Sequence, residues 1–97
     1  MNITENEGYK LLVKAIVAID NEEECHKFLD DIMTKKEVLD IAQRLMVAKL
    51  LSNKTVYNKI VEETGASTAT ISRVKRCYDY GSGGYIDILK KIERNNK

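Results

Sequence analysis

The sequence of 97 residues contains no proline and no tryptophan, and only one phenylalanine. Aliphatic side chains must therefore build most of the core, and no proline is present to interrupt a helix. No segment alternates between apolar and polar residues as a half-buried strand does. The composition therefore predicts an all-α fold.

Residues that support catalysis are equally scarce. His26 is the only histidine, and we interpret it as a solvated helix residue beside the acidic run NEEE. Cys25 and Cys77 lie far apart, without a CxxC partner or a histidine cluster, which is typical of free thiols in a reducing compartment. No Ser/His/Asp or Cys/His set can be assembled. We therefore expect no enzyme activity, no metal site and no cofactor.

Long apolar runs are absent as well. None approaches the roughly 20 residues that span a bilayer, and the first ten residues lack the basic-then-apolar order of a signal peptide. We therefore expect a cytoplasmic protein without a membrane partner.

Charge is distributed unevenly along the chain, although the net charge is only +1. Residues 1–40 carry ten acidic and five basic residues, whereas residues 41–97 carry five acidic and eleven basic residues. This asymmetry indicates that the C-terminal part faces a polyanion. With 43 % apolar and 32 % charged residues, the chain has the composition of one globular domain, residues 1–97.

Three helix starts have the spacing of a capping box or its asparagine variant, namely Thr4 with Glu7, Asn21 with Glu24, and Thr34 with Glu37. The first helix is predicted to end near residue 20, with Leu12, Ile16 and Ile19 buried and Leu11, Ala15 and Ala18 beside them. The second is predicted to bury Cys25, Phe28, Leu29 and Ile32.

The third predicted helix, from about residue 35 to residue 51, is apolar over most of its circumference. Its apolar residues are Val38, Leu39, Ile41, Ala42, Leu45, Met46, Val47, Ala48, Leu50 and Leu51. Such a helix must be covered on several sides, and one short chain has little to cover it with. We therefore expect a homodimer.

A helix-turn-helix is predicted at about residues 55–80. The first helix is predicted to be capped by Thr55 and to end at Gly65, because glycine tolerates the left-handed conformation that stops a helix. Ser67 is predicted to cap the second helix, which ends near Tyr80. The glycines of GSGG then stop that helix, and the segment YIDILKKIER forms the last one.

The second helix of this motif has an outer face of short hydroxyl residues followed by bases. Ile60, Ile71 and Val74 occupy the apolar positions that hold the two helices together, so the residues left facing outward are Ser67, Thr68, Thr70, Ser72, Arg73 and Arg76. Short hydroxyls allow a helix N-terminus to approach base edges and phosphates, and arginine reaches guanine or the backbone. This order favours duplex DNA binding. A basic helix that docks on an acidic protein, or on structured RNA, remains an alternative.

Two segments together resemble the Trp repressor superfamily, most closely its TrpR-related YerC/YecD branch. They are IMTKKEVLDIAQRLMVAKLL and GASTATISRVKRCYDYGSGGY, with ASTATISR the most specific part, and the resemblance covers residues 30–85 well. It implies a six-helix subunit that intertwines with a second copy. Together with the exposed face of the second helix, it leads us to expect a sequence-specific transcriptional regulator, in the first place a repressor. We also expect Lys75 to join the DNA-binding residues, and Tyr57 and Asn58, at the start of the preceding helix, to contact phosphates.

The resemblance also implies a possible ligand pocket. Arg44 and Arg73 match the two arginines that clamp the indole ring in the Trp repressor. However, Val74 replaces the glycine that leaves room for the ring, and Cys77 replaces the serine near the amino group of the ligand. We therefore predict DNA binding without tryptophan and leave any other effector open.

Overall fold

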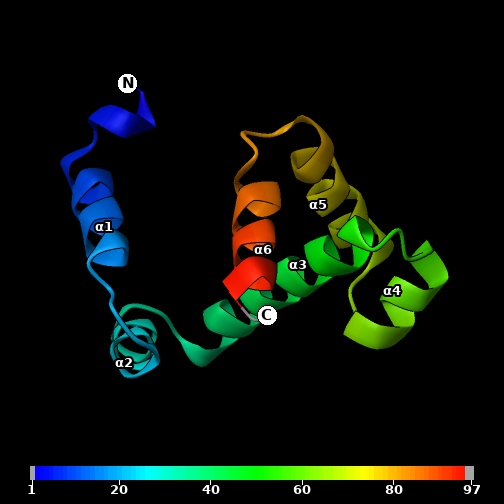
Figure 1. Ribbon diagram of the computed structural model, residues 1–97, viewed down its shortest axis with the longest axis horizontal. Coiled ribbons are helices and arrows are strands. Elements are labelled where there is room, and N and C mark those ends of the chain that lie inside the picture. Colours follow the sequence, from blue (N-terminus) through cyan, green and yellow to red (C-terminus); the bar gives the residue numbers. More distant parts are fainter. Residues whose placement is uncertain (1, 96–97) are drawn as a thin grey trace. The chain divides into compact units, whose positions relative to one another are not determined.

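The computed structural model describes residues 2–95, and all of the regular structure in this range is helical (Figure 1). Its elements are η1 (Ile3–Glu5), α1 (Glu7–Val17), α2 (Glu22–Ile32), α3 (Lys35–Ser52), α4 (Tyr57–Thr64), α5 (Thr68–Tyr80) and α6 (Gly84–Asn95). The expected all-α class with six helices is confirmed. The chain forms two compact units, which divide between Lys35 and Lys36.

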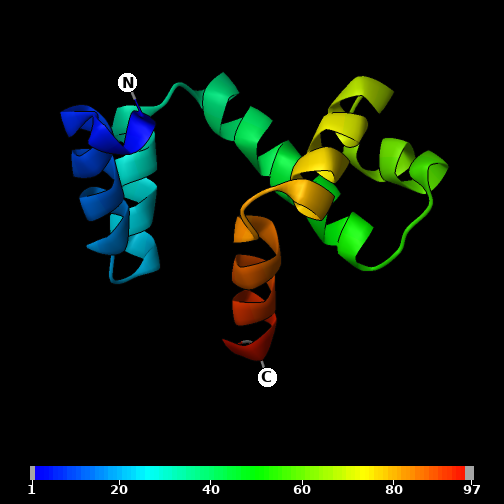
Figure 2. The ribbon, with the colours of Figure 1, turned by 90° about the horizontal axis from the view of Figure 1, so that it is seen from above.

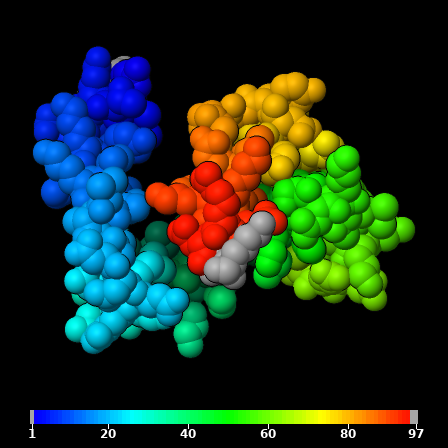
Figure 3. Space-filling model, viewed as in Figure 1, coloured from blue at the N-terminus to red at the C-terminus, as the bar shows by residue number. Residues whose placement is uncertain are grey.

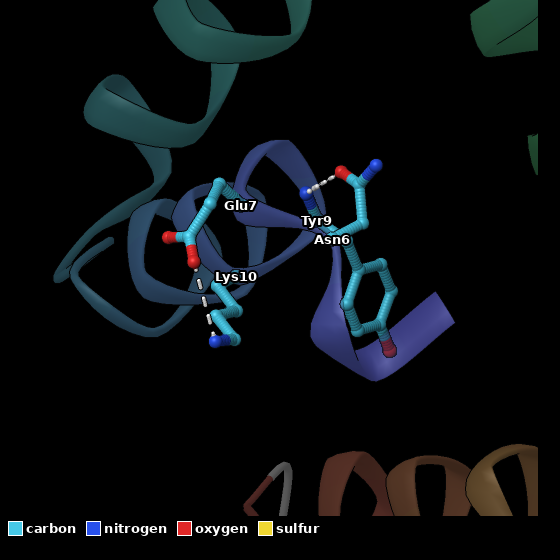
Figure 4. A network of polar contacts seen from close by, with 4 residues as sticks. All are labelled: Asn6, Glu7, Tyr9 and Lys10. Atoms are coloured by element: carbon cyan, nitrogen blue, oxygen red, sulfur yellow. Dashed lines mark hydrogen bonds and ion pairs between the residues drawn. The ribbon is translucent and has the colours of Figure 1, made fainter. Parts of the chain in front are cut away.

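The start of α1 differs from the prediction. Thr4 lies inside the 3-10 helix η1, and the cap of α1 is Asn6, whose Oδ1 accepts a hydrogen bond from the backbone N–H of Tyr9 at 2.9 Å (Figure 4). The side chains of Glu7 and Lys10 then pair across the first turn at 3.4 Å. Asn6 caps in place of Thr4 because an amide oxygen immediately before the helix can reach the free N–H groups of its first turn.

The first helix is also shorter and less buried than predicted. It ends at Val17, and the N–H of Ile19 then donates to the carbonyl oxygen of Ile16 at 3.2 Å, a bond to the third residue back that closes the last turn before residue 20. No side chain of α1 is buried, and Ile16, which we expected to be buried, is 53 % exposed. The apolar stripe of α1 is therefore only partly covered within its own compact unit.

The predicted cap of α2 is confirmed. Asn21 Oδ1 accepts from the N–H of Glu24 at 2.9 Å, and Glu24 Oε1 accepts from the N–H of Asp20 at 3.0 Å. The glutamate thus returns to the residue before the cap rather than to the cap itself. Along the predicted core face, Phe28 is half-buried, whereas Ile32 is 47 % exposed.

The core lies in the second unit, where α3, α4 and α5 meet. Its buried residues are Val47 and Ala48 of α3, Ile60 of α4, Ala66 of the following turn, and Ile71 and Val74 of α5. Leu89 of α6 packs against this cluster, and Figure 2 shows α6 continuing from the end of α5 after a short turn. The core therefore fixes α5 against α3 and α4.

Much of α3 remains exposed in one chain. Leu39 is 61 % exposed and Met46 is 48 % exposed, and Ile88 and Ile92 of α6 are similarly open. A groove of about 720 Å³ runs between α3 and α6, and its lining includes Leu45, Met46, Leu89 and Ile92. The space-filling view shows α6, in red, in front of the more distant α3 (Figure 3). This apolar surface agrees with the reading of α3 as a helix that one chain cannot cover.

The glycines between α5 and α6 have the expected role. The N–H of Gly81 donates to the carbonyl oxygen of Cys77 at 2.8 Å, and a Cβ at this position would collide with that oxygen. Only glycine therefore fits this end of α5. The last helix begins at Gly84, one residue earlier than predicted.

Candidate nucleic-acid interface

The turn between α4 and α5 is held by a left-handed glycine. Gly65 has a φ of 70°, and its N–H donates to the carbonyl oxygen of Val61 at 2.8 Å, which ends α4. This positive φ is the conformation that a glycine stop provides at low cost. The predicted end of the helix is confirmed.

Two polar side chains brace the same turn, and our sequence reasoning did not identify them. Thr64 Oγ1 donates to the carbonyl oxygen of Ile60 at 2.7 Å and accepts from the N–H of Ala66 at 3.1 Å. Gln43 of α3 then donates from Nε2 to the carbonyl oxygen of Thr64 at 3.1 Å. A threonine immediately before the glycine that ends a helix is a local signal for the two hydrogen bonds of Thr64. The Gln43 contact spans 21 positions and leaves no local signal.

The start of α5 is capped as predicted. Ser67 Oγ accepts from the N–H of Thr70 at 3.1 Å and donates to Thr70 Oγ1 at 3.0 Å. Ile71 and Val74 are buried, which fixes the rotation of α5 about its axis. The two predicted locking positions on α5, and Ile60 on α4, therefore lie where expected.

The predicted outer face of α5 is exposed with one exception. Its exposed members are Ser67, Thr68, Ser72, Arg73, Lys75 and Arg76. Thr70 is only half-exposed, and its hydroxyl accepts a hydrogen bond from Ser67. It is turned inward because α3 lies against this side of the first turn of α5, where Thr70 lines a pocket with Arg44.

The bases on this face differ in their partners. Within residues 2–95, neither Arg73 nor Arg76 forms an ion pair, whereas Lys75 Nζ lies 2.7 Å from Asp79 Oδ2. This hydrogen bond and the negative charge of Asp79 raise the pKa of Lys75.

The start of α4 is not capped by Thr55. The N–H of Thr55 closes the end of α3 by donating to the carbonyl oxygen of Leu50 at 3.0 Å, and Val56 occupies the cap position without a side-chain hydrogen bond. The prediction failed because the turn after α3 uses Lys54 in a left-handed conformation, with a φ of 59°, which moves the helix start by one residue. The N–H groups of Tyr57 and Asn58 in the first turn of α4 form no hydrogen bond within residues 2–95, and both residues are exposed.

A small polar pocket of about 210 Å³ lies between α3 and α5. It is lined by Asp40, Gln43, Arg44, Thr70, Arg73 and Val74. The structure therefore brings together Arg44, Arg73 and Val74 but not Cys77, which lines a separate cavity with Leu45 and Tyr85. Cys77 belongs to the side of α5 that faces α6 in one chain.

No group of histidine, cysteine or acidic residues within positions 2–95 could hold a metal ion. The thiols of Cys25 and Cys77 are both free, the first half-buried and the second exposed. No helix in the described range is long and apolar enough to cross a membrane.

Comparisons with known proteins place this geometry in a family. The family model for the Trp repressor protein matches residues 7–93. YerC of Bacillus subtilis (strain 168), an uncharacterized protein, is 45 % identical over 95 residues, which are 96 % of this chain and 91 % of YerC.

Two solved structures are similar throughout. One is a candidate Trp repressor from Staphylococcus aureus, with a TM-score of 0.88 and 41 % identity over 96 % of this chain and 95 % of that one. The other is a TrpR-like protein from Eubacterium eligens ATCC 27750, with a TM-score of 0.90 and 38 % identity over 96 % of both chains. The chain therefore belongs to the Trp repressor family, a non-enzymatic family whose membership implies a DNA-binding regulator.

Proposed function

We propose that this protein is a dimeric, sequence-specific transcriptional regulator that reads duplex DNA with α5 and acts as a repressor in the cytoplasm. The observation that carries the proposal is the exposed face of α5, where short hydroxyls precede two unpaired arginines. Ile71 and Val74 hold the opposite side of the helix in the core. The residues that would meet DNA are thus presented on a rigid element.

The N-terminal half of α5 is suited to the major groove. Ser67, Thr68 and Ser72 are short enough to let the helix approach the base edges and hydrogen-bond to them. Arg73 and Arg76 are long enough to reach guanine or a phosphate from the next turn. Because Thr70 is half-buried, it would position Ser67 rather than read a base.

The start of α4 supplies the phosphate contacts. Its first N–H groups have no cap, and Tyr57 and Asn58 are exposed beside them. A helix N-terminus attracts anions because its free N–H groups and its dipole both favour negative charge. Lys75 of α5 is exposed and would add a positive charge to the proposed DNA-binding surface.

A second copy of the chain would complete the molecule as an intertwined homodimer. It would cover the apolar side chains that α1, α3 and α6 leave exposed. We propose that residues 1–97 act as one domain in this assembly. In a dimer, two copies of α5 can enter successive major grooves roughly one helical turn apart.

Tryptophan is not required in this proposal. Val74 fills the position that would have to be empty for an indole ring, and it is 3 % exposed. Cys77, in addition, does not reach the pocket that holds Arg44 and Arg73. Both features argue against tryptophan as the ligand of this pocket.

The test begins with DNA fragments selected from the genome of the source organism by the wild-type protein. The double variant Arg73→Ala/Arg76→Ala should lose at least about tenfold in affinity for the selected duplex, because two phosphate or guanine contacts disappear. Wild-type affinity should fall with salt with a log–log slope of about −0.9 for each phosphate contacted. Fluorescence anisotropy measures both.

The matched control is Lys90→Ala/Lys91→Ala, which removes the same charge from the exposed surface of α6. It should bind almost as the wild type does. A selected duplex that binds no better than a random one, or equal losses in the two double variants, would contradict sequence-specific reading by α5. Preferential binding of folded RNA, or of an acidic protein, would support the alternatives instead.

A further inference from the structure

The last turn of α5 contains an acidic side chain, Asp79, at a position where it does not stabilise the helix. Asp79 lies one residue before the end of the helix. At this end the free carbonyl groups and the helix dipole carry partial negative charge, so an acidic side chain is disfavoured there. Its ion pair with Lys75 does not compensate for this, because a lysine four residues before an acid is the weaker of the two possible orders on a helix.

Asp79 is nevertheless closely engaged. Its Oδ2 lies 2.7 Å from Lys75 Nζ, whereas the ion pairs Lys36–Asp40, Lys10–Glu7 and Lys27–Glu23 measure 3.0, 3.4 and 3.7 Å. The side chains of Lys75 and Asp79 are 47 % and 35 % exposed, so the pair remains accessible to a competing anion.

The pair occupies the surface that the proposed function assigns to DNA. Lys75 lies between Arg73 and Arg76 in the sequence, and neither arginine has an ion-pair partner within residues 2–95. Lys75 alone among these three bases is already bonded to an anion of its own helix. A DNA phosphate that approached this lysine would have to displace the carboxylate.

We infer that Asp79 is an internal competitor of the DNA phosphate, and that it limits the affinity of this protein for duplex DNA by holding Lys75 in the free state. The inference rests on the proposed function. In the complex, Lys75 exchanges its bond to Asp79 for a bond to phosphate, and the released carboxylate remains near the negatively charged backbone. Both effects weaken binding, and both are independent of base sequence.

Such a competitor has a use in a regulator. Binding to random DNA comes almost entirely from phosphate contacts, whereas binding to a chosen site also draws on base contacts. A carboxylate that weakens one phosphate contact therefore removes a larger fraction of the random binding energy. Asp79 would keep the protein from being held at unrelated sequences.

The experiment measures the affinity for a fluorescent, mixed-sequence duplex of about three helical turns, from low to moderate salt. It compares the wild type with Asp79→Asn, Lys75→Gln and the double variant. We expect Asp79→Asn to bind threefold to tenfold more tightly, and its log–log salt slope to become steeper by up to about 0.9, since one more phosphate contact is made without competition. In the Lys75→Gln background the same change should give a clearly smaller gain, because only the repulsion between the carboxylate and the DNA backbone is then relieved.

Glu62→Gln is the matched control, because Glu62 is an exposed acid of α4. Equal gains from Asp79→Asn with and without Lys75, or equal gains from Glu62→Gln, would overturn the inference, since general charge would then explain them. Unchanged or weaker binding by a folded Asp79→Asn variant, with its helix content checked by circular dichroism, would also overturn it. If the wild type bound no duplex at all, the proposed function itself would fail, which separates the two results.

Discussion

Val74 is the residue that we expect to decide whether this protein can bind tryptophan. Its side chain is 3 % exposed and packs with Val47, Ile60 and Ile71 in the core that holds α5. The same side chain forms part of the wall of the pocket between Arg44 and Arg73. The side chain therefore occupies space that a ligand ring would need, and its packing in the core holds α5 in place.

This double role leads to a prediction for Val74→Ala and for tryptophan. Truncation should lower the free energy of unfolding by about 2 kcal/mol, because it removes buried methyl groups and leaves a cavity. Val61→Ala, at a site 37 % exposed on α4, should cost less than about 0.5 kcal/mol. Chemical denaturation measures both variants.

Titration of the wild type with tryptophan should release no heat of binding. Micromolar affinity, or tighter DNA binding in the presence of tryptophan, would show that the pocket accepts an indole ring despite Val74. Equal costs for the two alanine variants would show that Val74 is not needed to hold α5.

At the scale of the element, the start of α4 lacks a side-chain cap. Asn6, Asn21 and Ser67 cap α1, α2 and α5 with side-chain oxygens, whereas Val56 makes no such bond. Val56 is also 70 % exposed, so its side chain contributes little to the core. An uncapped start lowers the stability of the helix. We propose that these N–H groups are left uncapped because they bind a DNA phosphate.

Val56→Ser should therefore have opposite effects on stability and on binding. A serine at this position can cap the helix and raise the free energy of unfolding by about 1 kcal/mol. It should also weaken DNA binding by about tenfold, because the cap satisfies an N–H that would otherwise bond to a charged phosphate. Thermal melting and anisotropy provide the two measurements.

Val56→Ala is the control, since it shortens the side chain without adding a hydrogen-bond acceptor. It should change neither quantity by much. A serine variant that gains stability and keeps its full affinity for DNA would rule out phosphate binding at the start of α4.

At the scale of the whole molecule, apolar exposure is the dominant feature of one chain. Leu11, Val17 and Leu39 are each more than 60 % exposed, and no side chain of α1, α2 or α6 is fully buried in the described residues. A second copy that covers these surfaces would make folding and association one event.

We therefore expect the melting temperature to fall on dilution and sedimentation to show a dimer at micromolar concentration. An independent check is Leu39→Gln, at a site 61 % exposed in one chain, which should lower the melting temperature if a partner buries it. A monomer that melts at the same temperature over a wide range of concentrations would contradict the dimer.

Several features of the candidate site could be predicted from the sequence because they depend on neighbours in the chain. Ser67 bonds to an N–H three residues away, and Gly65 adopts a left-handed conformation that few other residues tolerate. The burial of Ile71 and Val74 likewise follows from the period of one helix. Local hydrogen bonds and periodicity leave a clear pattern in the order of the residues.

Only the tertiary structure decided the features that depend on contacts between helices. Thr70 turns inward because α3 lies beside it, Cys77 lines a different cavity from Arg44, and Gln43 reaches Thr64 across 21 positions. The choice of Val56 over Thr55 at the start of α4 depended on how the chain leaves α3. The order of residues on one helix determines which of its faces is apolar, but the side chains that meet that face come from distant parts of the chain and are fixed only when the helices pack.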